Sequence, residues 1–189
     1  SFRYSTLSTL IDDSETSIIS NLTTLTAKKG LEPSITANNA YTISFNNPIF
    51  NPSTTYEGAV TSSEFAFTDA AGESFSSCFM DDLNGTLRIF FLSGSDKVLL
   101  SNTAGTVTYA NGFISISSFK PDSFVGATLD FTITPSQNDL TPIRDQIFEI
   151  ANTNITITMQ DDQSTGTTSS TDTTASTTTG TTTGSSTTY

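Results

Sequence analysis

Apolar residues recur with two different periods along this chain. Near its start, the intervals between five apolar residues place them close to one face of a helix: Leu7, Leu10, Ile11, Ile18 and Leu22. Asp12-Asp13-Ser14 within this stretch is a candidate break or a helix N-cap. Residues 23–27 are rich in threonine, which favours a strand before a Lys28-Lys29-Gly30 turn. The sequence therefore predicts a helical lead-in and a first strand over residues 1–37.

From Tyr41 onward the period becomes two, which is typical of half-buried strands. Asn84-Gly85 lies between two apolar runs and supplies the positive φ angles of a tight hairpin turn. A second hairpin turn is predicted at Ala110-Asn111-Gly112. The run over residues 87–92 is apolar on both faces, so we expect a central strand or one covered on both sides. Two later runs alternate in the same way: Leu129, Phe131 and Ile133, and then Ile155, Ile157 and Met159.

These patterns predict a mainly β (α+β) chain. Residues 38–162 are expected to form an antiparallel, β-sandwich-like domain that follows the N-terminal helical segment. Residues 163–189 contain 20 Ser and Thr among 27 residues and a single charge, Asp172. Such a tract cannot bury enough apolar surface to offset the entropy of ordering, so we expect a tail that is disordered or ordered only by a partner.

The charge balance restricts the classes of partner. With 19 acidic and 7 basic residues, the chain carries a net charge of −12. It should repel nucleic-acid phosphates, and it suits partners with basic patches. No apolar stretch is long enough to span a bilayer. The first residue is Ser1, without a visible signal peptide, which suggests a processed chain or a fragment of a longer one.

The side chains that usually carry catalysis are scarce. The chain has no His and one Cys, and these counts remove the Ser-His-Asp arrangement and the usual zinc ligands. Carboxylate doublets occur at Asp12-Asp13, Asp81-Asp82 and Asp161-Asp162, but adjacent residues of a strand point apart, so no doublet forms a glycosidase pair by itself. We therefore predict no enzyme activity, no catalytic residue, no cofactor and no metal.

Residues 81–85 and Cys78 each have a structural and a ligand-binding interpretation. Residues 81–85 offer oxygen ligands for calcium, although Asp, Asn and Gly are also what a hairpin turn needs for backbone reasons, and we favour the turn. Cys78 lies within an apolar run, which favours a buried, inert thiol over a reactive or metal-binding one.

The candidate interface residues fall in two groups. Arg144 and Asp145 lie in the segment 138–150, and Arg is well suited to interface ion pairs because its planar fork binds carboxylates bidentately. An ion pair within the domain, or a solvated face, is an equally good reading. The second group consists of apolar residues in loops flanked by Pro and Asn: Ile49, Phe50, Phe119 and Phe124. They are candidate contact points, but the favoured alternative is that they plug the ends of the sandwich.

Several stretches, in order along residues 3–162, carry a resemblance to a known family. They are Leu10-Ile11-Asp12-Asp13-Ser14-Glu15, Ile19-Ser20-Asn21-Leu22-Thr23, Phe45-Asn46-Asn47-Pro48-Ile49, Val60-Thr61-Ser62-Ser63-Glu64-Phe65, Gly105-Thr106-Val107-Thr108-Tyr109-Ala110-Asn111-Gly112 and Leu140-Thr141-Pro142-Ile143-Arg144-Asp145-Gln146. With these stretches the sequence resembles the C-terminal region of the baseplate wedge protein of contractile-tailed bacteriophages, the baseplate-J-related, ring-forming subunit. The Ser/Thr tail departs from that pattern.

The resemblance implies a virion protein of the tail baseplate that has no catalytic residues. Its expected partners are other copies of itself, as a dimer within a larger ring, and other baseplate wedge proteins. Family members help to hold the baseplate together and to signal sheath contraction. The alternative is a cell-surface or adhesive β-domain in which residues 163–189 form an O-glycosylated stalk.

Overall fold

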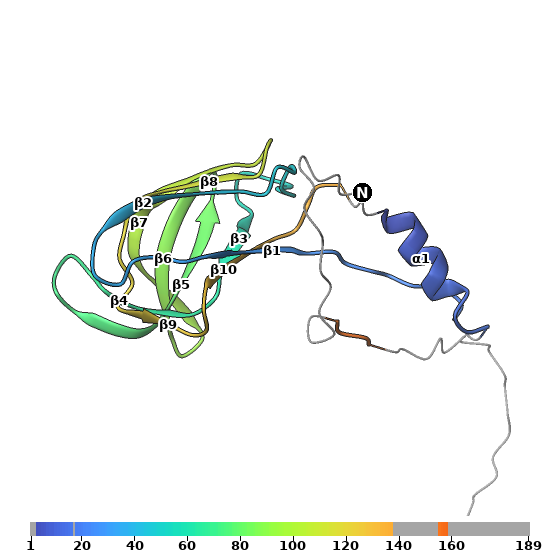
Figure 1. Ribbon diagram of the computed structural model, residues 1–189, viewed down its shortest axis with the longest axis horizontal. Coiled ribbons are helices and arrows are strands. Elements are labelled where there is room, and N and C mark those ends of the chain that lie inside the picture. The colour runs from blue at the N-terminus through green and yellow to red at the C-terminus, as the bar shows by residue number, and fades with distance from the viewer. Residues whose placement is uncertain (1–2, 17, 138–154, 159–189) are drawn as a thin grey trace, which may run out of the picture. The chain divides into compact units, whose positions relative to one another are not determined.

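The computed structural model describes residues 3–16, 18–137 and 155–158 of this chain. The chain divides into two compact units, residues 1–148 and 149–189. The helix and the strands belong to the first unit (Figure 1). They are α1 (Tyr4–Asp12), β1 (Ala27–Leu31), β2 (Asn39–Ser44), β3 (Glu57–Ser62), β4 (Phe65–Thr68), β5 (Ser74–Leu83), β6 (Thr86–Ser93), β7 (Asp96–Thr108), β8 (Phe113–Phe119), β9 (Ser123–Phe124) and β10 (Leu129–Ile133).

The ten strands of the described residues join one antiparallel sheet. The main path runs β1-β10-β3-β5-β6-β7-β8-β2, and β4 pairs with both β5 and β9. Strands β5 to β8 follow one another in chain order and are joined as hairpins, whereas β1 pairs with β10, which is about 100 residues later in the sequence. The predicted class, mainly antiparallel β with one N-terminal helix, is confirmed.

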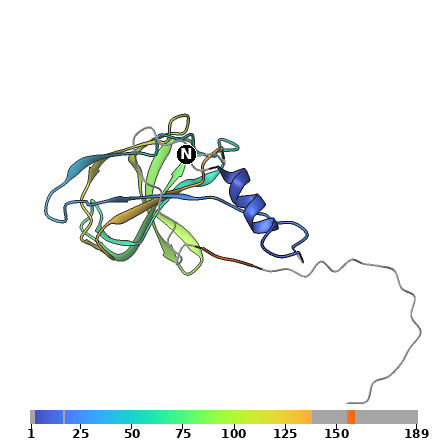
Figure 2. The same cartoon turned by 45° about the vertical axis from the view of Figure 1, so that its right-hand side comes forward.

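The sheet curls until it nearly closes on itself (Figures 1 and 2). After β2, the Phe50 N–H donates to the Thr134 carbonyl and the Ser136 N–H donates to the Pro48 carbonyl, each at 2.8 Å. Lys29 of β1 donates to the carbonyl of Ser44, the last residue of β2, at 3.0 Å. A single curved sheet therefore encloses the core, instead of two separate sheets packed face to face.

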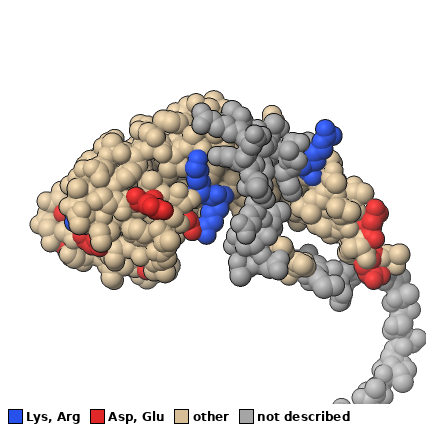
Figure 3. Space-filling view, viewed as in Figure 1, with Lys and Arg blue, Asp and Glu red and all other residues tan. Residues whose placement is uncertain are grey.

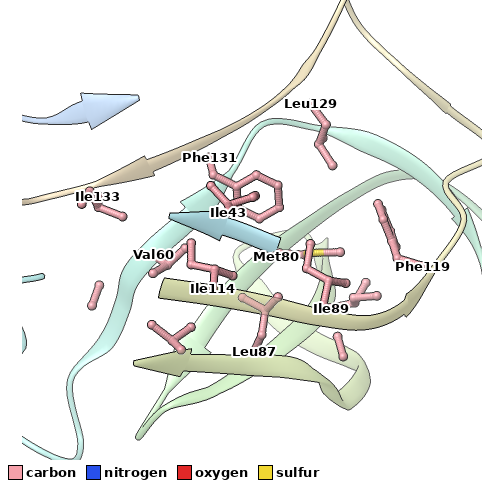
Figure 4. Close-up of a cluster of buried hydrophobic side chains, with 14 of the residues drawn as sticks. Ile43, Val60, Met80, Leu87, Ile89, Ile114, Phe119, Leu129, Phe131 and Ile133 are labelled. Atoms are coloured by element: carbon pink, nitrogen blue, oxygen red, sulfur yellow. The ribbon is translucent and has the colours of Figure 1, made fainter. Parts of the chain in front are cut away.

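The core is built from the inward residues of these strands (Figure 4). In β10 the alternation predicted from sequence is confirmed, because Leu129, Phe131 and Ile133 are buried while the residues between them are only half-buried. Phe65 and Phe119 meet edge to face with their ring centroids 5.2 Å apart. Each fully buried side chain of this size contributes about 1.5–3 kcal/mol of transfer free energy.

Two predicted hairpin turns are confirmed. Asn84 and Gly85 have φ angles of 49° and 79° and join β5 to β6. Gly112 has a φ of 66° in the β7–β8 turn, where a Cβ atom would lie 2.2 Å from the Asn47 carbonyl oxygen. Only glycine fits there, both for backbone conformation and for space. The structure adds an unpredicted turn between β6 and β7 at Gly94, with a φ of 66°.

The prediction for the first 37 residues was partly wrong. Helix α1 ends at Asp12, so the helical spacing does not extend to Leu22, which is 96% exposed. The segment Lys28-Lys29-Gly30 is not a turn, because all three residues lie inside β1 and pair with β10. Strand pairing between residues about 100 positions apart overrides the local turn signal, since strand formation depends on the neighbouring strand.

The strand predicted around Ile155 and Ile157 was also wrong for the residues described there. Residues 155–158 have no regular secondary structure, and the side chains of Ile155 and Ile157 are exposed. An alternating pattern forms a strand only where a neighbouring strand supplies hydrogen bonds and an apolar face to cover. Met159 lies outside the described residues.

Candidate functional site

The hairpin of β5 and β6 has two faces with different chemistry. Met80 lies opposite Ile89, and both side chains belong to the core. The next pair, Asp81 and Arg88, lies on the other face because side chains alternate along a strand. We call this second side the outer face and define it by residues of β3, β5, β6 and β7: Glu57, Phe79, Asp81, Arg88, Phe90, Leu92, Lys97 and Leu99.

A bidentate ion pair lies at the centre of the outer face. The Arg88 Nε donates to Asp81 Oδ1 at 2.9 Å, and Nη2 donates to Oδ2 at 2.8 Å. The two side chains are only 7% and 3% exposed. Burial by itself would lower the pKa of Arg88, but the hydrogen bonds to Asp81 and Glu57 outweigh it and raise that pKa. The guanidinium therefore stays charged and fixed in direction.

Glu57 and Lys97 extend this pair into a cluster of four charges. Arg88 Nη1 reaches Glu57 Oε1 at 3.3 Å, and Lys97 Nζ donates to Glu57 Oε2 at 3.0 Å and also to Asp81. The hydrogen bonds from Arg88 and Lys97 lower the pKa of Glu57. Burial opposes the charged form of Lys97, but its bonds to Asp81 and Glu57 raise its pKa overall. With two cations and two carboxylates, the cluster is neutral.

Aromatic and aliphatic side chains surround the cluster. The rings of Phe79 and Phe90 lie 5.8 Å apart, and Lys97 Nζ is 4.6 Å from the Phe90 ring centroid. Leu99 lies opposite Phe90 and is 47% exposed, whereas Leu92 lies opposite Lys97 and is 51% exposed. The outer face therefore presents apolar area beside charges that are already paired.

This composition suits binding to another protein. Aromatic residues and arginine dominate the energetics of protein interfaces, and leucines beside them add apolar area. Figure 3 draws one side of the molecule, on which charged side chains lie scattered among uncharged ones. In a chain of net charge −12, a neutral and partly apolar face is where a second acidic protein meets the least electrostatic repulsion.

On the core side of the same hairpin, Asp82 is fully buried and its two oxygens have different partners. Asp82 Oδ1 accepts the Val60 N–H at 2.6 Å, and Oδ2 accepts the Tyr109 hydroxyl at 2.5 Å. The Tyr109 oxygen in turn accepts the Gly85 N–H at 2.6 Å. Burial raises the pKa of Asp82, and burial together with the bond to Asp82 raises the pKa of Tyr109 to about 12. This network ties β3, the β5–β6 turn and the end of β7 together.

The carboxylates of Asp81 and Asp82 point to opposite sides of the sheet, which bears on the calcium-site alternative for residues 81–85. Asp81 lies on the outer face and Asp82 points into the core, so they cannot bind the same ion. Asn84 and Gly85 adopt the φ angles of the turn, as the favoured reading predicts. Within the described ranges, no group of three or more metal-ligating side chains occurs.

Cys78 has the environment that the sequence indicated. It is fully buried in the core between Phe65 of β4 and Phe91 of β6 in the strand register. Burial, together with the negative charges of Asp122 and Glu64, raises the pKa of its thiol to about 11. A thiol in this state reacts slowly with solvent-borne reagents.

The structure places the apolar interface candidates in different environments. Ile49 and Phe119 are buried at 3% and 1% exposure, and Phe124 packs against the core, which fits the reading that they close the ends of the sheet. Phe50 is 44% exposed and meets Tyr56 edge to face at 6.1 Å. Arg144 and Asp145 lie outside the described residues.

The sequence analysis did not predict the charged cluster, although the pairing of Asp81 with Arg88 could have been predicted from the position of the turn. Counting outward from the Asn84-Gly85 turn pairs residue 83 with 86 and therefore Asp81 with Arg88. An arginine inside an apolar run, opposite an aspartate, was the available signal. Glu57 and Lys97 could not be added in this way, because their positions depend on the β3–β5 ladder and on the unpredicted β6–β7 turn.

Comparison with known proteins finds no relative of the chain. No family model, no curated protein and no solved structure matches the chain. Among the described residues, no helix has both the length and the apolar character needed to cross a membrane.

Proposed function

We propose that this chain is a structural component of a contractile phage tail baseplate, a wedge subunit that acts through protein–protein contacts. Its partners are other copies of the chain and other wedge proteins, and its role lies in baseplate assembly and the signalling of sheath contraction. The wedge assignment is supported by the ordered stretches of sequence resemblance. The outer face carries the protein-binding part of the proposal.

The outer face is rigid at its centre. Asp81 and Arg88 are held by the β5–β6 register and by two direct hydrogen bonds, so little conformational entropy is lost when a partner covers them. The exposed leucines at positions 92 and 99 then supply the apolar area that a partner can bury. Because the cluster is neutral, covering it does not strand an unpaired charge.

A structure of the native particle tests the wedge assignment directly. Electron microscopy of isolated tails should place this β domain in the baseplate, with the outer face against a neighbouring protein. Absence of the chain from the particle would refute the assignment. Detection of the chain on a cell surface, with glycans on residues 163–189, would instead establish the adhesive alternative.

A single substitution tests the outer face. Leu92→Asp places a charge on an exposed position of this face, so we expect an unchanged melting temperature and partner binding weakened about tenfold or more. Val125→Asp is the matched control, because Val125 is 80% exposed and lies outside the outer face. Equal loss of binding in both variants, or in neither, would remove the outer face from the proposal.

A further inference from the structure

One half of β7 has a partner on only one side. Residues 105–108 pair with β6 or its turn on one edge and with β8 on the other. Residues 96–104 pair with β6 alone among the described parts of the chain. Their other edge presents backbone N–H and C=O groups for which the β8 ladder supplies no partner. We call residues 96–104 the free edge of β7.

Beyond Lys97, the free edge of β7 lacks the usual protection of an edge strand. Proteins commonly place lysine, proline or another charge along an exposed edge to prevent pairing with a second chain. After Lys97, the sequence has no charged residue until Lys120, and no proline occurs in that interval either. Val98 and Leu99 are 38% and 47% exposed, and the side chains of Asn102 and Thr103 are exposed as well.

Strand β1, at one end of the sheet, shows what a protected edge looks like in the same chain. In β1, Lys28 binds Asp130 at 2.7 Å, and Lys29 donates to the carbonyl of Ser44 in β2. An incoming strand would have to displace Lys29 from Ser44. No comparable side chain stands along residues 98–104, so β1 and the free edge of β7 differ in how readily they can accept another strand.

We infer that the free edge of β7 pairs in antiparallel fashion with the same edge of a second copy of this chain. Two copies of net charge −12 repel each other over most of their surfaces. Residues 98–104 are uncharged, so a twofold pairing centred within them sets no like charges directly opposite each other. Antiparallel pairing of identical edges is self-complementary, as a twofold interface requires.

Such pairing also draws on the outer face. Leu99 belongs to both features, so a second copy that pairs along the free edge would also cover part of the outer face. The backbone hydrogen bonds would supply affinity, and the exposed Val98 and Leu99 would supply apolar contact. The inference rests on the proposed function in one respect, that self-association belongs to the role of the chain.

A cysteine scan tests both the contact and its register. Single cysteines are introduced in the 189-residue chain by Val98→Cys, Leu99→Cys, Leu100→Cys, Ser101→Cys, Asn102→Cys and Thr103→Cys. The native Cys78 is fully buried and gives little background. Oxidation should produce covalent dimers of about 40 kDa, twice the 20.1 kDa chain, at one or two adjacent positions only. Cross-linking at none, or equally at all six, would overturn the twofold pairing.

Sedimentation velocity of charge variants provides an independent measurement. Asn102→Lys with Thr103→Lys puts two lysines on the free edge, and these should weaken dimerisation roughly tenfold or more, because four like charges then meet across the axis. Ala37→Lys with Asn38→Lys is the control, which adds the same charge at two exposed loop positions. Dimerisation that weakens equally in both variants would assign the effect to net charge and overturn the inference.

The outcomes separate this inference from the proposed function. A chain that occupies the baseplate but stays monomeric in solution and forms no cross-link refutes the β7 pairing and leaves the wedge role standing. A chain that dimerises through β7 but is absent from the particle refutes the wedge role alone. If residues 98–103 cross-link to a different protein and not to each other, the free edge accepts another strand and the second-copy assignment is wrong.

Discussion

Asp81 and Asp82 are neighbours in β5, yet their carboxylates lie on opposite sides of the sheet and have different kinds of partner. Asp81, on the outer face, is compensated by full charges, because Arg88 and Lys97 both bind it. Asp82, in the core, is compensated only by neutral donors, the Val60 N–H and the Tyr109 hydroxyl. The comparison shows that burial of a carboxylate has no single consequence. Its effect depends on whether a cation or a dipole lies opposite.

The largest expected effect comes from removing the cation. Arg88→Ala leaves Asp81 buried without its main partner, so the free energy of unfolding should fall by about 3–5 kcal/mol. Urea denaturation measures this loss. In the double variant Arg88→Ala with Asp81→Ala, much of the stability should return, because neither charge is then stranded. A loss below about 1 kcal/mol in the single variant would mean that Asp81 is solvated, as in surface pairs.

Removing a neutral hydrogen-bond partner of Asp82 should cost less stability than removing Arg88. Tyr109→Phe removes one hydrogen bond to Asp82 and one from the Gly85 N–H, so we expect a loss of about 1.5–3 kcal/mol in the same assay. Tyr56→Phe is the control, because the Tyr56 hydroxyl has no hydrogen-bond partner among the described residues, and it should change stability by less than about 0.5 kcal/mol. Equal effects of the two substitutions would deny the network a stabilising role.

The smallest and most informative difference is in pH dependence. Asp82 has a raised pKa, so its contribution is fully present below its unfolded-state pKa and is lost as pH rises through the raised value. Glu57 has a lowered pKa, so its contribution is present above its unfolded-state pKa and is lost as pH falls through the lowered value. The two sides of the hairpin should therefore respond to pH with opposite sign.

Unfolding curves at several pH values for the native chain, Asp82→Asn and Glu57→Gln measure these slopes. Relative to Asp82→Asn, the native chain should lose stability as pH rises. Relative to Glu57→Gln, it should gain stability, by a smaller amount because Glu57 is half exposed. If the stability differences for the two variants changed with pH in the same direction, then Asp82 and Glu57 would not be stabilised in two different ways.

The β5–β6 hairpin was predictable because its information is local. Asn84-Gly85 determines the turn, and the turn determines which residues face each other, including Asp81 and Arg88. The placement of β1 was not predictable, because Ala27–Leu31 pairs with β10 about 100 residues later and nothing near Lys28-Lys29-Gly30 indicates that partner. The same holds for Glu57, whose place beside Arg88 depends on a ladder with a register shift.

The close approach at Gly112 has a consequence for the order of folding. The segment that nearly closes the sheet is held on the β7–β8 turn, since the Phe45 N–H donates to the Gly112 carbonyl at 2.9 Å and the Ile49 N–H donates to the Tyr109 carbonyl at 2.8 Å. The turn forms from neighbouring residues, whereas the contact of Phe50 with Thr134 closes a loop of more than 80 residues. We therefore expect the hairpins to form early and the seam between the two ends of the sheet to close last. The β7–β8 turn that contains Gly112 must therefore form before the two ends of the sheet can come together.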